Sequence, residues 1–173
     1  MPNDDPTRGN VAIRARIPKF ASINKRLGKL SKKGIALDDV LRKVADLMEG
    51  AIMDNFVKKA NAQGTSWPPA KKWYEEVKAA AGRSADNLLV YNGTLKQSLS
   101  DGKTSDGQKA AVGTNVPYAR IHNFGGTVGA GAYPWFAGKK IPKRQFMYLS
   151  ASVKEAIRRA FLQFIGDNIK GAI

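Results

Sequence analysis

The sequence predicts an α+β protein in which a small antiparallel β-sheet packs against two main amphipathic helices, with an extended N-terminal arm and a long glycine-rich loop. Two stretches, residues 37–62 and 152–165, repeat apolar side chains at helical spacing. Between them, Asp-Gly turn signals precede a short apolar stretch, which is typical of a β-hairpin. We therefore expect a basic arm with a short strand and helix over residues 1–36, and a single α+β domain over residues 37–173 with a loop insertion at residues 125–141.

The composition of the chain is strongly basic. Its 173 residues include 29 Lys plus Arg against 14 Asp plus Glu, a formal net charge of +15. This excess indicates an anionic neighbour such as DNA, RNA, a membrane surface or an acidic protein, and a solvated basic surface without a dedicated ligand is the alternative. The absence of cysteine excludes disulfides and thiolate metal sites. With no apolar run long enough to span a membrane and no apolar segment typical of a secretory signal, we expect a soluble protein that stays in the cell that makes it.

The first 36 residues carry much of the excess charge. Residues 11–17 alternate apolar and polar side chains, which predicts a strand ended by Pro18. Residues 20–30 then show apolar side chains at helical spacing, which predicts a basic helix before Gly34. Such a helix could touch nucleic acid or a membrane surface, but we favour packing of its apolar side on the domain. Its exposed candidates for contacts with DNA or an acidic partner are Lys25, Arg26, Lys29, Lys32 and Lys33.

The clearest helix is predicted over residues 37–62. One apolar stripe runs along it, acidic residues lie in its first turn and lysines in its last, and Gly64 supplies a stop. Packing of this helix on a sheet is favoured over a coiled coil, because the stripe is short. The following segment, which contains Trp67, is expected to be extended, since the two prolines after the tryptophan disfavour helix. A further helix is predicted over residues 71–81.

The hairpin is predicted between residues 101 and 113. Asp101-Gly102 and Asp106-Gly107 are the strongest turn signals in the chain, and residues 109–113 form the returning strand. The preceding residues 95–100 fit either a strand or a helical turn. After the central stretch, a final helix is expected with Ser150 or Ser152 as its cap, since Ser152 and Glu155 have capping-box spacing.

The stretch from Val112 to Arg144 concentrates glycines, aromatic side chains and His122, the only histidine of the chain. One histidine and no cysteine leave few ways to build a metal site or a nucleophile–base pair, so a structural role for His122 is favoured over a catalytic one. The glycines match neither the P-loop nor the dinucleotide-binding pattern, and the carboxylates are scattered. We therefore predict no enzymatic activity, no cofactor and no metal.

The glycines of this stretch have a conformational use. Gly125 and Gly126 follow Phe124 and permit a sharp departure from a strand that we expect there. The loop after them ends in the aromatic residues Tyr133, Trp135 and Phe136. Either these side chains order the loop against a partner, or they fold back on the chain's own core, and the sequence favours neither.

Four short elements, taken together, resemble a known family. They are a Trp67-Pro68 segment, LVYNGTLKQS at residues 89–98, GTNVPYARIHNFGG at residues 113–126 and IPKRQFMYLS at residues 141–150. Their types and order are similar to those of the phage virion morphogenesis proteins, also called the Mu G-like or tail completion family, and the resemblance covers about residues 37–169. The chain departs from the family pattern at Asn123, where glutamine is usual.

The resemblance implies a non-enzymatic virion component of a tailed phage or prophage, with an α+β fold. It implies a neck or tail completion protein that forms a ring at the head–tail junction of the virion after assembly in the host cytoplasm. The implied partners are further copies of the chain, neighbouring neck, connector or tail-tube proteins, and the DNA in the channel, with no membrane. The residues that we assign to the assembly interface on this basis are Tyr118, His122, Phe124, Gly125, Gly126, Tyr133, Trp135, Phe136, Arg144 and Phe146.

Overall fold

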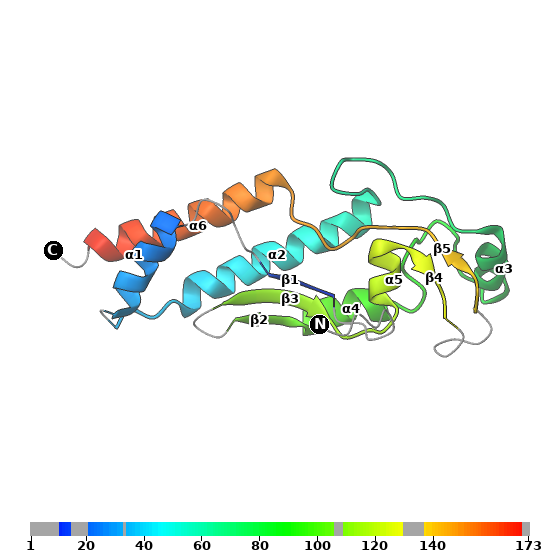
Figure 1. Cartoon of the computed structure of the whole chain (residues 1–173), viewed down its shortest axis with the longest axis horizontal. Coiled ribbons are helices and arrows are strands. Elements are labelled where there is room, and N and C mark those ends of the chain that lie inside the picture. Colours follow the sequence, from blue (N-terminus) through cyan, green and yellow to red (C-terminus); the bar gives the residue numbers. More distant parts are fainter. Residues whose placement is uncertain (1–10, 15–20, 33, 106–108, 130–136, 171–173) are drawn as a thin grey trace.

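A computed structural model describes residues 11–14, 21–32, 34–105, 109–129 and 137–170 of the chain. It confirms the α+β class, with helices gathered around a small antiparallel sheet (Figure 1). The elements, in chain order, are β1 (Val11–Arg14), α1 (Ala21–Lys32), α2 (Asp38–Lys58), α3 (Lys72–Ala80), α4 (Thr94–Asp101), β2 (Lys103–Ser105), β3 (Ala110–Thr114), α5 (Ala119–Phe124), β4 (Gly126–Thr127), β5 (Lys140–Ile141) and α6 (Ala151–Lys170).

The two long helices, α2 and α6, lie side by side, and the sheet packs on α2 (Figure 1). The stripe predicted on α2 is buried, with Met48 and Ile52 at 0% exposure. The helix ends earlier than predicted, because Lys59 adopts a left-handed conformation (φ 49°) and its N–H still bonds Asn55 O. Gly64 instead closes the turn that follows, where its N–H donates to Asn61 O over 3.0 Å.

The sheet has the strand order β1–β3–β2, with both pairings antiparallel. The predicted hairpin is therefore confirmed as β2 and β3, although Asp106-Gly107 itself lies outside the described residues. The prediction of a hairpin turn at Asp101-Gly102 is wrong: α4 ends at Asp101, and the turn at Gly102 joins this helix to β2. A Cβ atom on Gly102 would lie only 2.0 Å from Gly113 O, so this glycine is required by the close approach of α4 to β3.

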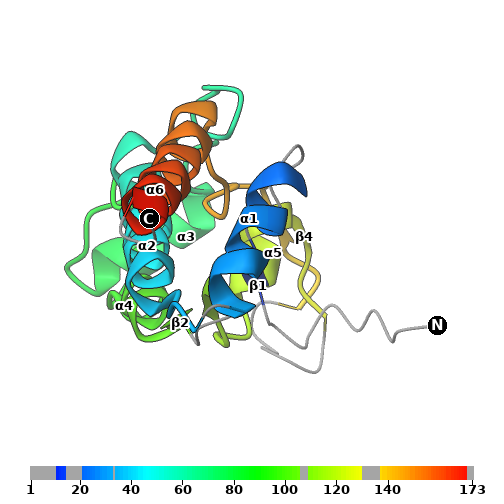
Figure 2. The ribbon, with the colours of Figure 1, turned by 90° about the vertical axis from the view of Figure 1, so that its left-hand side faces the viewer.

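The described part of residues 1–36 is joined to the rest of the chain in two places. β1 pairs with β3, with Ile13 opposite Val112. At the far end of the molecule, α1 packs on the C-terminal half of α6 (Figure 2). This second cluster buries one side of α1 as favoured from the sequence, through Ile23, Leu27, Leu30 and Ile165. Whether residues 37–173 form a domain by themselves stays a prediction.

Two local predictions near the family motifs are corrected. Residues 119–124 form the helix α5, whereas a strand was expected before Gly125. Ser150 caps α6, since its Oγ accepts the N–H of Val153 over 3.3 Å. Ser152 lies inside that helix, so the predicted capping box is wrong. Segment 95–100, for which strand and helix were both open, belongs to α4.

Candidate assembly surface

The short helix α5 is locked to the extended segment 141–149 by one buried side chain. Asn123 is 2% exposed, and its Oδ1 accepts the backbone N–H groups of Phe146 over 3.1 Å and of Met147 over 3.0 Å. The N–H of Arg144 donates to His122 O over 2.8 Å. These bonds hold α5 at a fixed angle to the segment that leads into α6, because each buried donor would otherwise lack a partner.

Arg144 ties the same segment to the Trp-Pro-Pro element. Its Nε donates to Pro68 O over 2.9 Å and its Nη2 to Pro69 O over 2.6 Å, and the side chain is 5% exposed. Next to it, Gly125 has φ 75°, and a Cβ atom there would lie 2.9 Å from Lys143 N. Glycine is therefore required at the end of α5, both by its left-handed conformation and by the neighbouring backbone.

Aromatic packing completes this frame. The ring of Phe146, at 0% exposure, lies 5.2 Å from that of Phe56, which makes an edge contact with Trp67 at 5.9 Å. Trp67 Nε1 donates to Gln145 O over 3.2 Å, and Asn55 Nδ2 donates to Phe146 O over 2.8 Å. The side-chain N–H donors of Trp67 and Asn55 thus both bond backbone carbonyls of the same segment.

The fourth motif element joins the frame through α4. Leu95 and Leu99 are buried in the main core, at 2% and 0% exposure. Ser98 Oγ lies 2.6 Å from Thr114 Oγ1, which also accepts the N–H of Val116 over 3.1 Å. All four elements that carry the family resemblance therefore meet in one packed unit built from α2, α4, α5 and segment 141–149.

The structure separates the residues assigned to the assembly interface into three groups. Phe124 is 56% exposed, and Gly126 beside it is also exposed. Tyr118 and His122 are half-buried and make an edge-on ring contact at 5.8 Å. Arg144 and Phe146 lie inside the chain's own packed unit together with the pinned Gly125. The remaining three, Tyr133, Trp135 and Phe136, lie outside the described residues.

Sequence reasoning missed Asn123 and Lys78. Lys78 is 1% exposed, and its Nζ donates to the carbonyl oxygens of Ser84 over 3.2 Å, Asn87 over 2.6 Å and Val90 over 3.3 Å. Burial lowers the pKa of this lysine, and the positive charge of Arg144 lowers it further. The segment between α3 and α4 is thus wrapped around a single ammonium group. The position of Asn123 within a family motif could have drawn attention to that residue. No pattern in the sequence marks Lys78.

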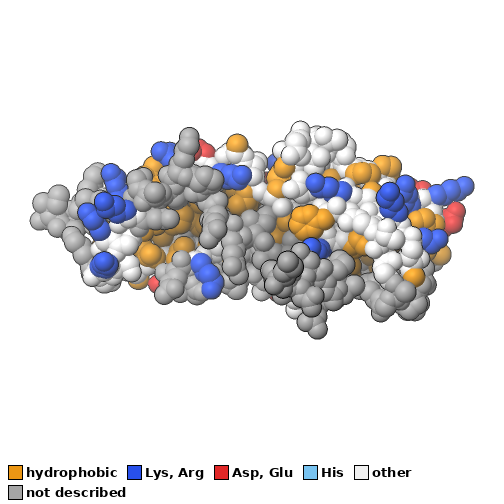
Figure 3. Space-filling view, viewed as in Figure 1, with side chains coloured by type: hydrophobic (Ala, Val, Ile, Leu, Met, Phe, Trp, Pro, Cys, Tyr) orange, Lys and Arg blue, Asp and Glu red, His pale blue; other side chains and the backbone are white. Residues whose placement is uncertain are grey.

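The basic candidates lie at the opposite end of the molecule. Lys25, Arg26, Lys29 and Lys32 are exposed on α1, which contains no acidic residue, and Lys33 lies outside the described residues. Figure 3 shows Lys and Arg side chains gathered over α1. In the part of the chain that the structure describes, no three His, Cys, Asp or Glu side chains group as metal ligands. No helix there has the length and apolarity needed to cross a membrane.

The Nδ1 atom of the half-buried His122 is itself buried, which favours the neutral form of the ring. Its Nδ1 has no hydrogen-bond partner among the described residues, and burial, with a smaller contribution from the charge of Arg144, lowers its pKa from 6.5 to about 4. Between these two values the unfolded chain binds a proton that the folded chain does not. Stability is therefore expected to fall as the pH drops from 6.5 towards 4.

We expect the titration of His122 to lower the free energy of unfolding by about 3 kcal/mol between pH 7.5 and pH 4. Urea unfolding of the native chain and of His122→Phe at both pH values measures this loss, since phenylalanine keeps a ring beside Tyr118 but does not titrate. The difference between the two proteins isolates the histidine from the carboxylates, which titrate in both. If the free energy of unfolding falls equally in the two proteins, His122 is not the source of the pH dependence.

The arrangement defines a structural scaffold, because polar side chains of its motifs bond the chain's own backbone and the ring of Phe124 is left exposed beside them. Residues 19–165 match the model of the phage virion morphogenesis family, so the chain belongs to that family. The description of that family is phage virion morphogenesis.

One curated relative, an uncharacterized protein of Methanocaldococcus jannaschii, is 30% identical over 95 residues. The match covers 54% of this chain and 63% of the relative, so it spans less than two thirds of that protein. No solved structure matches the chain.

Proposed function

We propose that the protein is a tail completion or neck component that forms a ring at the head–tail junction of a tailed phage. The observation that carries the proposal is the contrast within one motif: Asn123 is buried and holds α5 in place, while the next residue, Phe124, is 56% exposed. A rigidly held exposed aromatic ring is typical of an interface anchor. Membership of a virion morphogenesis family supports the same reading.

The partners that we propose are further copies of the chain and the neighbouring neck, connector or tail-tube proteins. Assembly would take place in the host cytoplasm, and the protein would remain at the neck or tail end of the virion. Native mass measurement of the purified chain, alone and mixed with the portal and tail-tube proteins of the same phage, tests this. We expect a closed oligomer in at least one mixture, and a monomer without a partner under every condition would contradict the proposal.

A second function, nucleic-acid binding, is favoured by α1. Its exposed side includes Lys25, Arg26, Lys29 and Lys32, and the helix has no carboxylate to neutralise them. A row of cations without carboxylates between them suits the phosphate backbone of DNA. Protein binding to this backbone weakens as the salt concentration rises, because binding releases counterions from the DNA. In a ring, such a surface could approach the DNA in the channel.

Changing these four residues to glutamine is expected to weaken DNA binding at low salt at least tenfold and to flatten its salt dependence, because fewer counterions are released. Electrophoretic mobility shift or fluorescence titration at several salt concentrations measures both effects. The matched control changes four exposed lysines far from α1, Lys58, Lys71, Lys72 and Lys96, to glutamine. Equal losses in both variants would assign binding to net charge and not to α1, and no salt-dependent shift with the native protein would exclude the function.

A further inference from the structure

The exposed ring of Phe124 stands in a purely basic part of the sequence. From Gly107 to Lys154 there is no Asp or Glu, and this stretch contains seven Lys or Arg residues. The guanidinium carbon of Arg120 lies 5.7 Å from the Phe124 ring centroid, and Lys143 next to the pinned Gly125 is exposed. The surface is therefore an apolar knob with a cationic rim on a rigid support, and a fitting partner would offer an apolar recess with an acidic edge.

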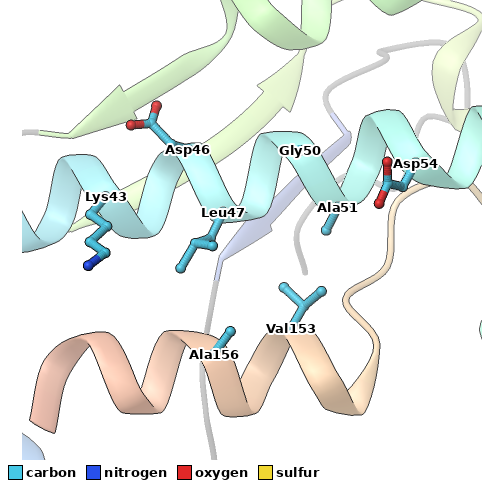
Figure 4. Close-up of a pocket in the computed structure, with 8 residues that line it drawn as sticks. All are labelled: Lys43, Asp46, Leu47, Gly50, Ala51, Asp54, Val153 and Ala156. Atoms are coloured by element: carbon cyan, nitrogen blue, oxygen red, sulfur yellow. The ribbon is translucent and has the colours of Figure 1, made fainter. Parts of the chain in front are cut away.

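The same chain contains such a recess elsewhere. A groove of about 410 Å³ lies between α2 and α6. Figure 4 shows that Leu47 and Ala51 of α2 point toward Val153 and Ala156 of α6, so apolar side chains form its floor. These four side chains are only half-buried. At Gly50 an added Cβ atom would meet no other atom within 4 Å, so the groove is open along α2 at this point.

Charge and exposed apolar surface extend along one edge of this groove. Asp54 is exposed and belongs to no ion pair among the described residues. Asp46 points away from the groove in Figure 4, and its carboxylate is 2.7 Å from Lys103 Nζ. Val57, one turn beyond Asp54 on the same side of α2, is 74% exposed. The groove thus combines apolar walls with two exposed charges that belong to no ion pair among the described residues, the ammonium of Lys43 and the carboxylate of Asp54.

We propose that Phe124 of one copy inserts into the α2–α6 groove of the next copy, with Arg120 facing Asp54 across the contact. The inference rests on the proposed ring and names the two surfaces that build it. The knob and the groove lie at different places on one chain, so each copy can insert its Phe124 side chain into one neighbour and receive the Phe124 side chain of the other. Such head-to-tail contacts close into a circular oligomer when the rotation between copies permits.

Disulfide trapping tests this geometry directly, because the native chain contains no cysteine. The double variant Thr127→Cys with Gly50→Cys places one thiol on the exposed strand β4 beside Phe124, whose ring stays intact, and one in the groove. We expect oxidation to produce a ladder of covalent oligomers on a non-reducing gel, with at least a tenfold higher yield than the control pair Thr127→Cys with Lys96→Cys, in which the second cysteine is on α4. Each single variant can form at most a dimer.

Failure of this contact can be separated from failure of the ring. If the variants form an oligomer with the mass of the native assembly but are not trapped above the control level, the proposed contact is wrong and the proposed circular oligomer is unaffected. A monomer under all conditions would overturn both. A Gly50→Cys variant that is trapped only with a different phage protein would assign the groove to that partner and would also contradict the proposal.

Charge exchange provides a second measurement. Arg120→Glu and Asp54→Lys are each expected to raise the dissociation constant of the oligomer about tenfold, and the two together are expected to recover most of that loss, because the pair is restored with opposite signs. Additive losses in the double variant would contradict a direct contact. Thermal unfolding of each variant checks that the chain still folds.

Discussion

Replacing Phe146 by alanine is expected to lower the free energy of unfolding by about 3–5 kcal/mol. The ring is 0% exposed and packs 5.2 Å from the ring of Phe56, in the core where α2, α5 and segment 141–149 meet. Alanine would leave a cavity that the surrounding backbone cannot close, because Asn55 and Asn123 hold that backbone by hydrogen bonds. Urea unfolding measures the loss.

Phe124→Ala is the matched control for this substitution. Its side chain is 56% exposed and lies only 22 residues earlier in the chain, so we expect a change in stability within about 0.5 kcal/mol. Its effect should instead appear in the mass of the assembly. Similar stability losses in the two variants would contradict the division of the motif into a buried frame and an exposed ring.

Lys78→Met is expected to lower the free energy of unfolding by about 3 kcal/mol, because three carbonyl groups lose their donor. Methionine fills the space of the lysine stem but cannot bond Ser84, Asn87 and Val90. The loss should concentrate in the segment between α3 and α4. Hydrogen exchange measures this: the amides of residues 83–90 should exchange faster, while those of α2 should accelerate only as far as the fall in global stability requires.

Lys72→Met serves as the control for Lys78→Met. It makes the same chemical change on the same helix, but Lys72 is exposed, so we expect little effect on stability or exchange. If both variants behave alike, the ammonium of Lys78 does not organise the segment.

Much of the fold could be predicted because periodicity is a local property of sequence. The stripe of α2, the apolar side of α1 and the β2–β3 hairpin each follow from side-chain spacing or from an Asp-Gly turn. The helix α5 could not be predicted in this way. Its six residues, Ala119–Phe124, are too few to show a helical period, and its geometry depends on bonds to residues more than twenty positions away.

The sequence by itself determined the class of fold, the two main helices, the basic character of α1 and the family to which the chain belongs, because each is written in residue types and their spacing. Only the tertiary structure decided what the motif residues do. Arg144 and Lys78 bond backbone carbonyls, which every residue possesses and no sequence pattern marks. Burial of Phe146 and exposure of Phe124 likewise depend on which segments meet in space, so two similar side chains in neighbouring motifs have opposite physical roles.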